Sequence, residues 1–210
     1  MATICPTITA YTEHEYKQQI DAVKDFAKRI HFDLMDGEFA PTKSPALSKI
    51  WLTLHITADI HLMYQRPMDY LEQLIKLKPH MVIIHNEAHV HHMHFAAELH
   101  KHDIKAGLAI LRDTPIEYAY QIMHSFDQVL VFSGHLGYHG GEADLGLLDK
   151  VQKIKAHHPD AEIAWDGGIN ADNIKQLAEA GVDVLNVGGA IQKTSNPEDA
   201  YVRLKEVIKG

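Results

Sequence analysis

Short apolar runs alternate with amphipathic segments along the whole chain. The apolar runs predict eight β-strands, at residues 3–7, 30–35, 56–63, 81–85, 104–110, 128–132, 162–166 and 184–187. Between the runs, apolar residues recur at helical spacing, as in residues 16–26, 71–77, 147–154 and 174–178. Two Pro residues that follow a capping residue, in Thr114-Pro115 and Asn196-Pro197, predict two further helix starts.

This alternation predicts a parallel sheet joined by right-handed crossovers. Eight strand–helix units favour a closed (β/α)8 TIM barrel, with an eight-stranded parallel core, over an open sheet. No linker or low-complexity tract divides the chain. We therefore expect a single catalytic domain over residues 1–210.

Composition narrows the class of protein. The formal net charge is −8, which disfavours a general role in binding nucleic acid or an anionic membrane. No apolar run approaches the length needed to span a bilayer, and the start of the chain lacks the pattern of a signal peptide. The single Cys5 cannot form an internal disulfide, which suits a cytoplasmic protein. We also expect a homo-oligomer.

Four residues in three separated segments suggest a metal site. His31, Asp33, His61 and Asp166 fall near the ends of the second, third and seventh predicted strands. Active sites of such barrels lie at the carboxyl ends of the strands, and residues two apart on one strand face the same side. The four side chains can therefore converge on one divalent ion. This ligand set would suit zinc, iron, manganese or cobalt.

The two carboxylates of this set also suggest acid–base chemistry at carbon. Epimerisation needs one group that removes a proton from one face and another that returns a proton to the opposite face. Asp33 and Asp166, on different strands, could flank the reacting carbon. A divalent ion would lower the energy of the enediolate formed when the proton leaves.

Glycine-rich loops follow the last three predicted strands and suggest a phosphate site. Loops at this end of a barrel bind phosphate through backbone amides, and glycine permits a close approach. No Lys or Arg lies inside these loops, so we expect the amides to carry the binding. The glycines concerned are Gly137, Gly140, Gly141, Gly167, Gly168, Gly188 and Gly189.

Two further features each allow two interpretations. Met35 and Met63 lie two residues after proposed ligands, so they either cover an apolar side of the site or pack in the core. His89, His91, His92 and His94 are either a second metal site or a solvated helix start. We favour the helix start, because no carboxylate or cysteine completes a ligand set.

Taken in chain order, the sequence motifs of this protein resemble those of the ribulose-phosphate 3-epimerase family along nearly the whole chain. Residues 31–41 are similar to the family's H-I-D-V-M-D-G-x-F-V-P, residues 59–63 to D-V-H-L-M, and residues 85–88 to H-x-E-A. Residues 166–170 match D-G-G-I-N. The first and last of these motifs are specific when they occur together.

The resemblance implies a barrel enzyme that binds one metal, usually zinc, through His31, Asp33, His61 and Asp166. It implies that Asp33 and Asp166 are the acid–base pair, and that Thr7 contacts the substrate. The implied reaction interconverts ribulose 5-phosphate and xylulose 5-phosphate at C3. It would belong to carbohydrate metabolism, in the pentose phosphate pathway. An epimerase of a hexulose 6-phosphate, such as allulose 6-phosphate, is an alternative within the family.

The chain departs from the family pattern on the substrate side. After the sixth strand, residues 134–142 lack the Asn-Pro of N-P-G-F-G-G-Q and gain a residue, and residues 111–113 also lack an Asn-Pro. Phe132 replaces a methionine, and Gly189 stands where a phosphate-contacting serine is usual. The altered loop motivates another alternative, a non-catalytic barrel that binds a sugar phosphate.

A related phosphosugar decarboxylase is a further alternative that the sequence disfavours. Those enzymes resemble one another in a D-x-K-x-x-D motif on the third strand. Here Asp59 matches the first position, whereas the Lys and the final Asp are missing.

Overall fold

A closed barrel of eight parallel strands forms the centre of the protein, as the sequence predicts. The computed structural model describes residues 2–210. The strands pair in chain order, and β1 pairs with β8 to close the barrel. Their bounds are β1 Thr3–Thr9, β2 Arg29–Met35, β3 Thr57–Met63, β4 Met81–His85, β5 Lys105–Ile110, β6 Gln128–Phe132, β7 Glu162–Asp166 and β8 Val184–Val187.

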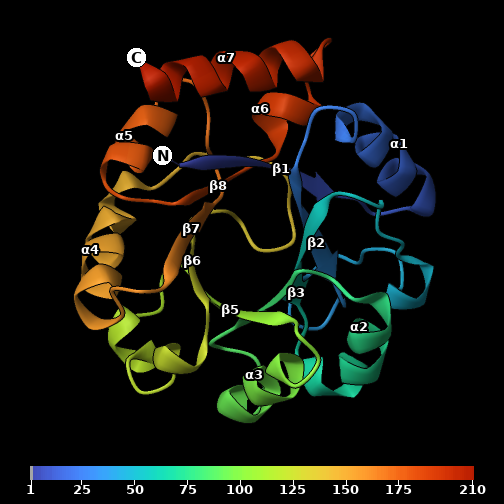
Figure 1. Cartoon of the computed structure of the whole chain (residues 1–210), viewed down its shortest axis with the longest axis vertical. Helices are drawn as coiled ribbons and strands as arrows, with labels where there is room; N and C mark the ends of the chain where they lie inside the picture. Colours follow the sequence, from blue (N-terminus) through green and yellow to red (C-terminus); the bar gives the residue numbers. More distant parts are fainter. Residues whose placement is uncertain (1) are drawn as a thin grey trace.

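Helices surround the barrel (Figure 1). They bury one apolar face against the strands, as Tyr16, Ile20 and Val23 do in the first helix. No helix among residues 2–210 is long and apolar enough to cross a bilayer. The α-helices are α1 Glu13–Val23, α2 Leu71–Leu77, α3 His92–His100, α4 Leu148–His157, α5 Ile174–Glu179, α6 Gly189–Gln192 and α7 Pro197–Lys209.

The two predicted Pro helix starts have different outcomes. Asn196 caps α7 by accepting the amide of Asp199, and Pro197 occupies the first turn, as predicted. The prediction at Thr114-Pro115 is wrong, because only the short 3₁₀ segments Ile116–Ala119 and Met123–Ser125 lie between β5 and β6. Pro115 has an extended ψ of 133°, so it precedes the turn instead of opening a helix.

Lys150 explains how this segment is held without an α-helix. Its ammonium donates to the backbone carbonyls of Leu111, Arg112 and Thr114, at 2.8, 2.9 and 2.7 Å. These bonds hold the segment after β5 against the start of α4. The crossover from β2 to β3 likewise has only the 3₁₀ segment Leu47–Lys49.

Alternate strand residues fill the barrel interior with an apolar layer between two polar ends. The middle layer is one cluster drawn from six strands, with Cys5, Met81, Ile83, Ala109, Leu130, Phe132, Ala164 and Val184. Apolar residues of the opposite alternation pack outward beneath the helices. Because the side-chain period of a strand is two, this register leaves polar residues at the strand starts and at the strand ends.

An ionic network closes the barrel where the strands begin. The Arg29 guanidinium donates to Asp59 at 2.5 Å and forms two 2.8 Å bonds to the Glu162 carboxylate. Gln128 donates to the same carboxylate at 2.7 Å. The network joins β2, β3, β6 and β7, and the Asp59 side chain is only 1% exposed.

Replacing Arg29 with Met should therefore lower the free energy of unfolding by about 3–5 kcal/mol, because the buried carboxylate of Asp59 loses its ion-pair partner. Arg66→Met is the matched control, since Arg66 pairs with Glu38 on the exposed surface and should change stability far less. Urea denaturation followed by circular dichroism measures both. Equal losses in the two variants would contradict a role for the network in stability.

Candidate functional site

The four predicted metal-site residues meet at the carboxyl end of the barrel. His31 and Asp33 lie on β2, His61 lies opposite Asp33 on β3, and Asp166 ends β7. One ligand atom from each side chain can be chosen so that all four lie within 4.8 Å of one another. All four residues are buried. The alternation along β2 explains the pairing of His31 with Asp33, because residues two apart face the same side.

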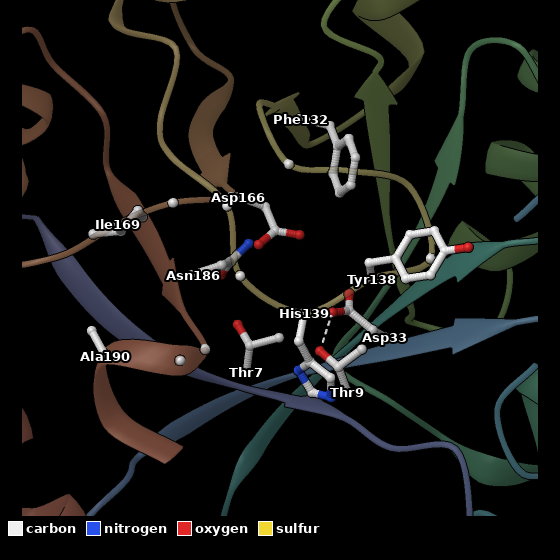
Figure 2. A pocket seen from close by; sticks show the side chains of 18 of the residues that line it. Thr7, Thr9, Asp33, Phe132, Tyr138, His139, Asp166, Ile169, Asn186 and Ala190 are labelled. Carbon is white, nitrogen blue, oxygen red and sulfur yellow. Dashed lines mark hydrogen bonds between the residues drawn. The ribbon is translucent and has the colours of Figure 1, made fainter. Parts of the chain in front are cut away.

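Asp33 is the centre of this cluster. Its Oδ1 lies 3.0 Å from Nδ1 of His61 and 3.3 Å from Nε2 of His31. The same two nitrogens each lie 3.8 Å from Oδ2 of Asp166. The second oxygen of Asp33 accepts a 2.6 Å hydrogen bond from the hydroxyl of Thr9. Figure 2 shows the two carboxylates projecting into one pocket, with Thr9 beside Asp33 and Asn186 beside Asp166.

The two carboxylates have opposite pKa shifts. Burial disfavours the charged form of Asp33, but the imidazoles of His31 and His61 outweigh that effect and hold its pKa well below the usual range. Burial and the nearby charge of Asp33 raise the pKa of Asp166 well above its ordinary value. Two carboxyl groups that share a buried site commonly separate in this way into one ionised and one protonated group.

The cluster has the chemistry and spacing of a metal site. Both ring nitrogens of His31 are buried without a hydrogen-bond partner. Four ligands placed tetrahedrally around zinc lie about 3.4 Å from one another, and the distances above range from 3.0 to 3.8 Å. The His/Asp cluster could therefore hold a divalent metal ion. Among residues 2–210, it is the only such group of three or more His, Cys, Asp or Glu.

A cavity of about 270 Å³ opens above the cluster. Thr7, Met63 and all seven predicted glycines line it, and so does Phe132, which ends β6. Met35 is not among the lining residues, and it packs with Ala40 and Met63 in a small apolar cluster. The core interpretation therefore holds for Met35, whereas Met63 borders the cavity. The glycines that line it are Gly137, Gly140, Gly141, Gly167, Gly168, Gly188 and Gly189.

Gly168 shows why glycine is needed in these loops. Its φ is +72°, and a Cβ there would lie 2.0 Å from the backbone nitrogen of Ala143. The loop after β7 thus packs directly against the loop after β6, and no side chain fits between them.

Thr9 and Asn186 are polar residues of the pocket that the sequence pattern did not predict. Thr9 lies two residues after Thr7 on β1. Asn186 lies opposite Asp166 on β8, and both its amide oxygen and its amide nitrogen are buried without a hydrogen-bond partner. The hydroxyl of Thr7 is unpartnered as well. The sequence signal that could have identified Asn186 is a polar residue at an interior position of β8.

The altered loop after β6 brings a new side chain into the pocket. His139 lines the cavity, with its ring 5.4 Å from the ring of Tyr11. Lys193, which follows α6, reaches the same loop, and its Nζ lies 3.8 Å from the position that a Cβ would take on Gly140. A cation therefore does lie beside the glycine loops, although none lies within them.

His91, His92 and His94 lie at the start of α3, and His89 lies in the bend before it. His91 is the N-cap and accepts the amide of His94 at 3.3 Å. His92 points inward, and its Nε2 lies 3.0 Å from the carbonyl oxygen of His85. This arrangement agrees with the prediction of a helix start.

Comparison with known proteins gives a consistent picture. Residues 3–192 match the model of the Ribulose-phosphate 3 epimerase family. The chain is 30% identical over 209 residues to a ribulose-phosphate 3-epimerase of Mycobacterium bovis, a match that covers 96% of this chain and 91% of that protein. It is also 30% identical over 213 residues to a ribulose-phosphate 3-epimerase of Helicobacter pylori, covering 97% of each protein.

Solved structures support the fold. A 3-hexulose-6-phosphate synthase from Salmonella typhimurium has a TM-score of 0.73 and 16% identity, covering 98% of each chain. At that identity the likeness concerns the barrel alone. The sequence relatives and the family match are more specific, and they confirm the prediction of an isomerase. The chain belongs to the ribulose-phosphate 3-epimerase family.

Proposed function

We propose that this protein is a metal-dependent 3-epimerase that interconverts ribulose 5-phosphate and xylulose 5-phosphate by two-base proton transfer at C3. The observation that carries the proposal is the pair of buried carboxylates, Asp33 and Asp166, which project into one cavity with opposite pKa shifts. A non-catalytic binder would have no need of this pair. Membership of the family supports the same reaction.

His31, His61, Asp33 and Asp166 would hold the metal. The unpartnered nitrogens of His31 and the spacing of the four ligand atoms support this assignment. When bound, a divalent cation would supply positive charge that lowers the energy of an enediolate. Zinc suits two imidazoles and two carboxylates, and it is the metal that we propose.

Asp33 and Asp166 would divide the proton transfer. Asp33, ionised by its neighbours, is suited to remove the proton from C3 on one face. Asp166, whose pKa is raised by burial and by the charge of Asp33, is suited to deliver a proton to the opposite face of the same carbon. The electron pair left by the first proton is then taken up in the new C–H bond, and the two carboxyl groups exchange protonation states. The reverse reaction uses them in the opposite order.

The remaining pocket residues would bind and orient the substrate. Thr7 and Asn186 offer unpartnered donors and acceptors beside Asp166, where substrate hydroxyls can complete their hydrogen bonds. The glycine loops after β6, β7 and β8 leave backbone amides accessible for a phosphate. Lys193 adds a positive charge next to Gly140. We further propose a cytoplasmic homo-oligomer.

Solvent exchange at C3 is the direct test of this function. Zinc-loaded protein is incubated in D2O with ribulose 5-phosphate, xylulose 5-phosphate and allulose 6-phosphate, and proton NMR follows the C3 signal. We expect both pentulose phosphates to interconvert with incorporation of one deuterium at C3, and a chelator to stop the exchange. Exchange restricted to the hexulose phosphate would favour the alternative substrate, and no exchange with any sugar would overturn the proposal.

Asp33→Asn and Asp166→Asn should each lower kcat by about 100- to 10,000-fold, because an amide can neither remove nor deliver the proton. Asp172→Asn is the control, because Asp172 is exposed at the rim and should leave turnover unchanged. Circular dichroism checks that all three variants fold. Near-normal turnover in either of the first two variants would show that the two-base assignment is wrong.

Asn186→Leu should lower kcat/KM without lowering stability. Loss of one substrate hydrogen bond is worth about 1 kcal/mol, or roughly fivefold in kcat/KM. The free energy of unfolding of the free protein should stay the same or rise, because the variant removes a buried amide that has no partner. Steady-state kinetics and thermal denaturation measure the two effects. A loss of stability at unchanged kcat/KM would instead assign Asn186 a structural role.

A further inference from the structure

The ring of His61 makes a second contact that the proposed reaction does not use. Its Nδ1 faces Asp33, whereas its Nε2 lies 2.8 Å from Nε2 of His85. Both rings are fully buried and stacked, with centroids 4.9 Å apart. Two neutral imidazoles at this distance share one proton, so one ring donates and the other accepts. The protonation pattern of His85 therefore dictates that of His61.

His85 extends this contact to a carboxylate. Its Nδ1 lies 3.5 Å from Oε2 of Glu87, and neither atom has a hydrogen-bond partner although both are buried. The other oxygen of Glu87 accepts the backbone amide of Leu111 at 3.1 Å, which fixes the carboxylate in place. Three side chains, His61, His85 and Glu87, thus form a line that leads from the metal cluster to the loop after β5.

With both imidazoles neutral and a cation bound at Nδ1 of His61, one of the two possible proton arrangements satisfies every atom of this line. If Nδ1 of His61 carries the proton and donates to Asp33, then His85 must donate from Nε2. Its bare Nδ1 then faces the bare oxygen of Glu87, which leaves both atoms unpartnered. If Nδ1 of His61 is instead free to bind a cation, its Nε2 donates to His85, and Nδ1–H of His85 donates to Glu87.

We propose that His85 and Glu87 are positioning residues that hold His61 in the tautomer whose Nδ1 binds the metal. The inference rests on the metal site of the proposed function and adds two residues outside it. Outer partners of this kind fix ring orientation and tautomer at metal sites, and their loss typically weakens metal binding by about 10- to 100-fold. The rings of Phe39 and Phe132 pack against the fully buried ring of His85, at 4.8 and 5.7 Å between centroids.

The test is zinc affinity, measured on the metal-stripped full-length protein by competition with a chromophoric chelator. His85→Phe fills the same space but removes the acceptor for His61, and we expect zinc to bind about 10- to 100-fold more weakly. His85→Gln restores an acceptor oxygen and should recover affinity to within a few-fold of wild type. Glu87→Gln, whose amide can donate to His85 and favour the wrong tautomer, should weaken binding too.

His92→Phe is the matched control, because His92 bonds to the backbone oxygen of His85 and not to its ring, so zinc affinity should stay unchanged. If His85 had only a structural role, His85→Gln would bind zinc as weakly as His85→Phe. Nitrogen-15 NMR of the imidazoles provides the second readout. The zinc-loaded wild type should show a proton on Nε2 of His61 and on Nδ1 of His85.

Unchanged zinc affinity in both His85→Phe and Glu87→Gln, or a proton on Nδ1 of His61 in the zinc-loaded protein, would overturn the proposal. These results are separable from the proposed function. If zinc affinity depends on His85 and Glu87 as expected but the wild type exchanges no C3 proton, only the proposed epimerase function is contradicted. A wild type that exchanges the proton while the variants bind zinc normally counts against the positioning role alone.

Discussion

Electrostatic repulsion between Asp33 and Asp166 is the constraint on which the site depends. Two carboxylates buried in one cluster cannot both be ionised without a compensating positive charge. The structure keeps one of them charged beside His31 and His61 and raises the pKa of the other. The same crowding makes the cluster a strong candidate for a divalent cation. A buried arrangement that would destabilise an ordinary core is thus suited to moving protons.

The barrel makes this arrangement possible through register. His31 and Asp33 share a face of β2, and parallel pairing sets His61 opposite Asp33. Closure of the sheet brings Asp166 on β7 to the same cluster. Apolar residues fill the layer below, and the Arg29 network closes the opposite end. The four candidate ligands therefore lie on strands braced by a packed interior, which holds their geometry more firmly than loops would.

The strand pattern could be predicted from sequence because buried parallel strands are continuous apolar runs. Each predicted strand overlaps an observed one, and their ends differ by two residues at most. Helix starts were less predictable. Asn196-Pro197 follows local capping rules, whereas the segment at Pro115 is held by Lys150, which lies far away in the chain. Long-range contacts of that kind leave no local signal.

The difference between local signals and long-range contacts also separates the parts of the site that could be predicted from those that could not. The candidate ligands could be predicted because His and Asp residues at strand ends are unusual, while the proposed roles of Asn186 and Lys193 depend on which loops and strands become neighbours. Strand alternation allows Met35 to lie either beside the cavity or in the core, and the choice depends on its packing with Ala40 from the loop after β2. His85 was visible in a motif, yet its contact with His61 required the pairing of β3 with β4.

X-ray absorption at the zinc edge of metal-loaded protein tests the central claim most directly. The account predicts one zinc ion per chain, bound by two imidazole nitrogens and two carboxylate oxygens at about 2.0–2.2 Å. His31→Ala should reduce the imidazole signal from two rings to one. A shell of oxygens alone, or an imidazole signal that His31→Ala leaves unchanged, would contradict a metal centre at this cluster.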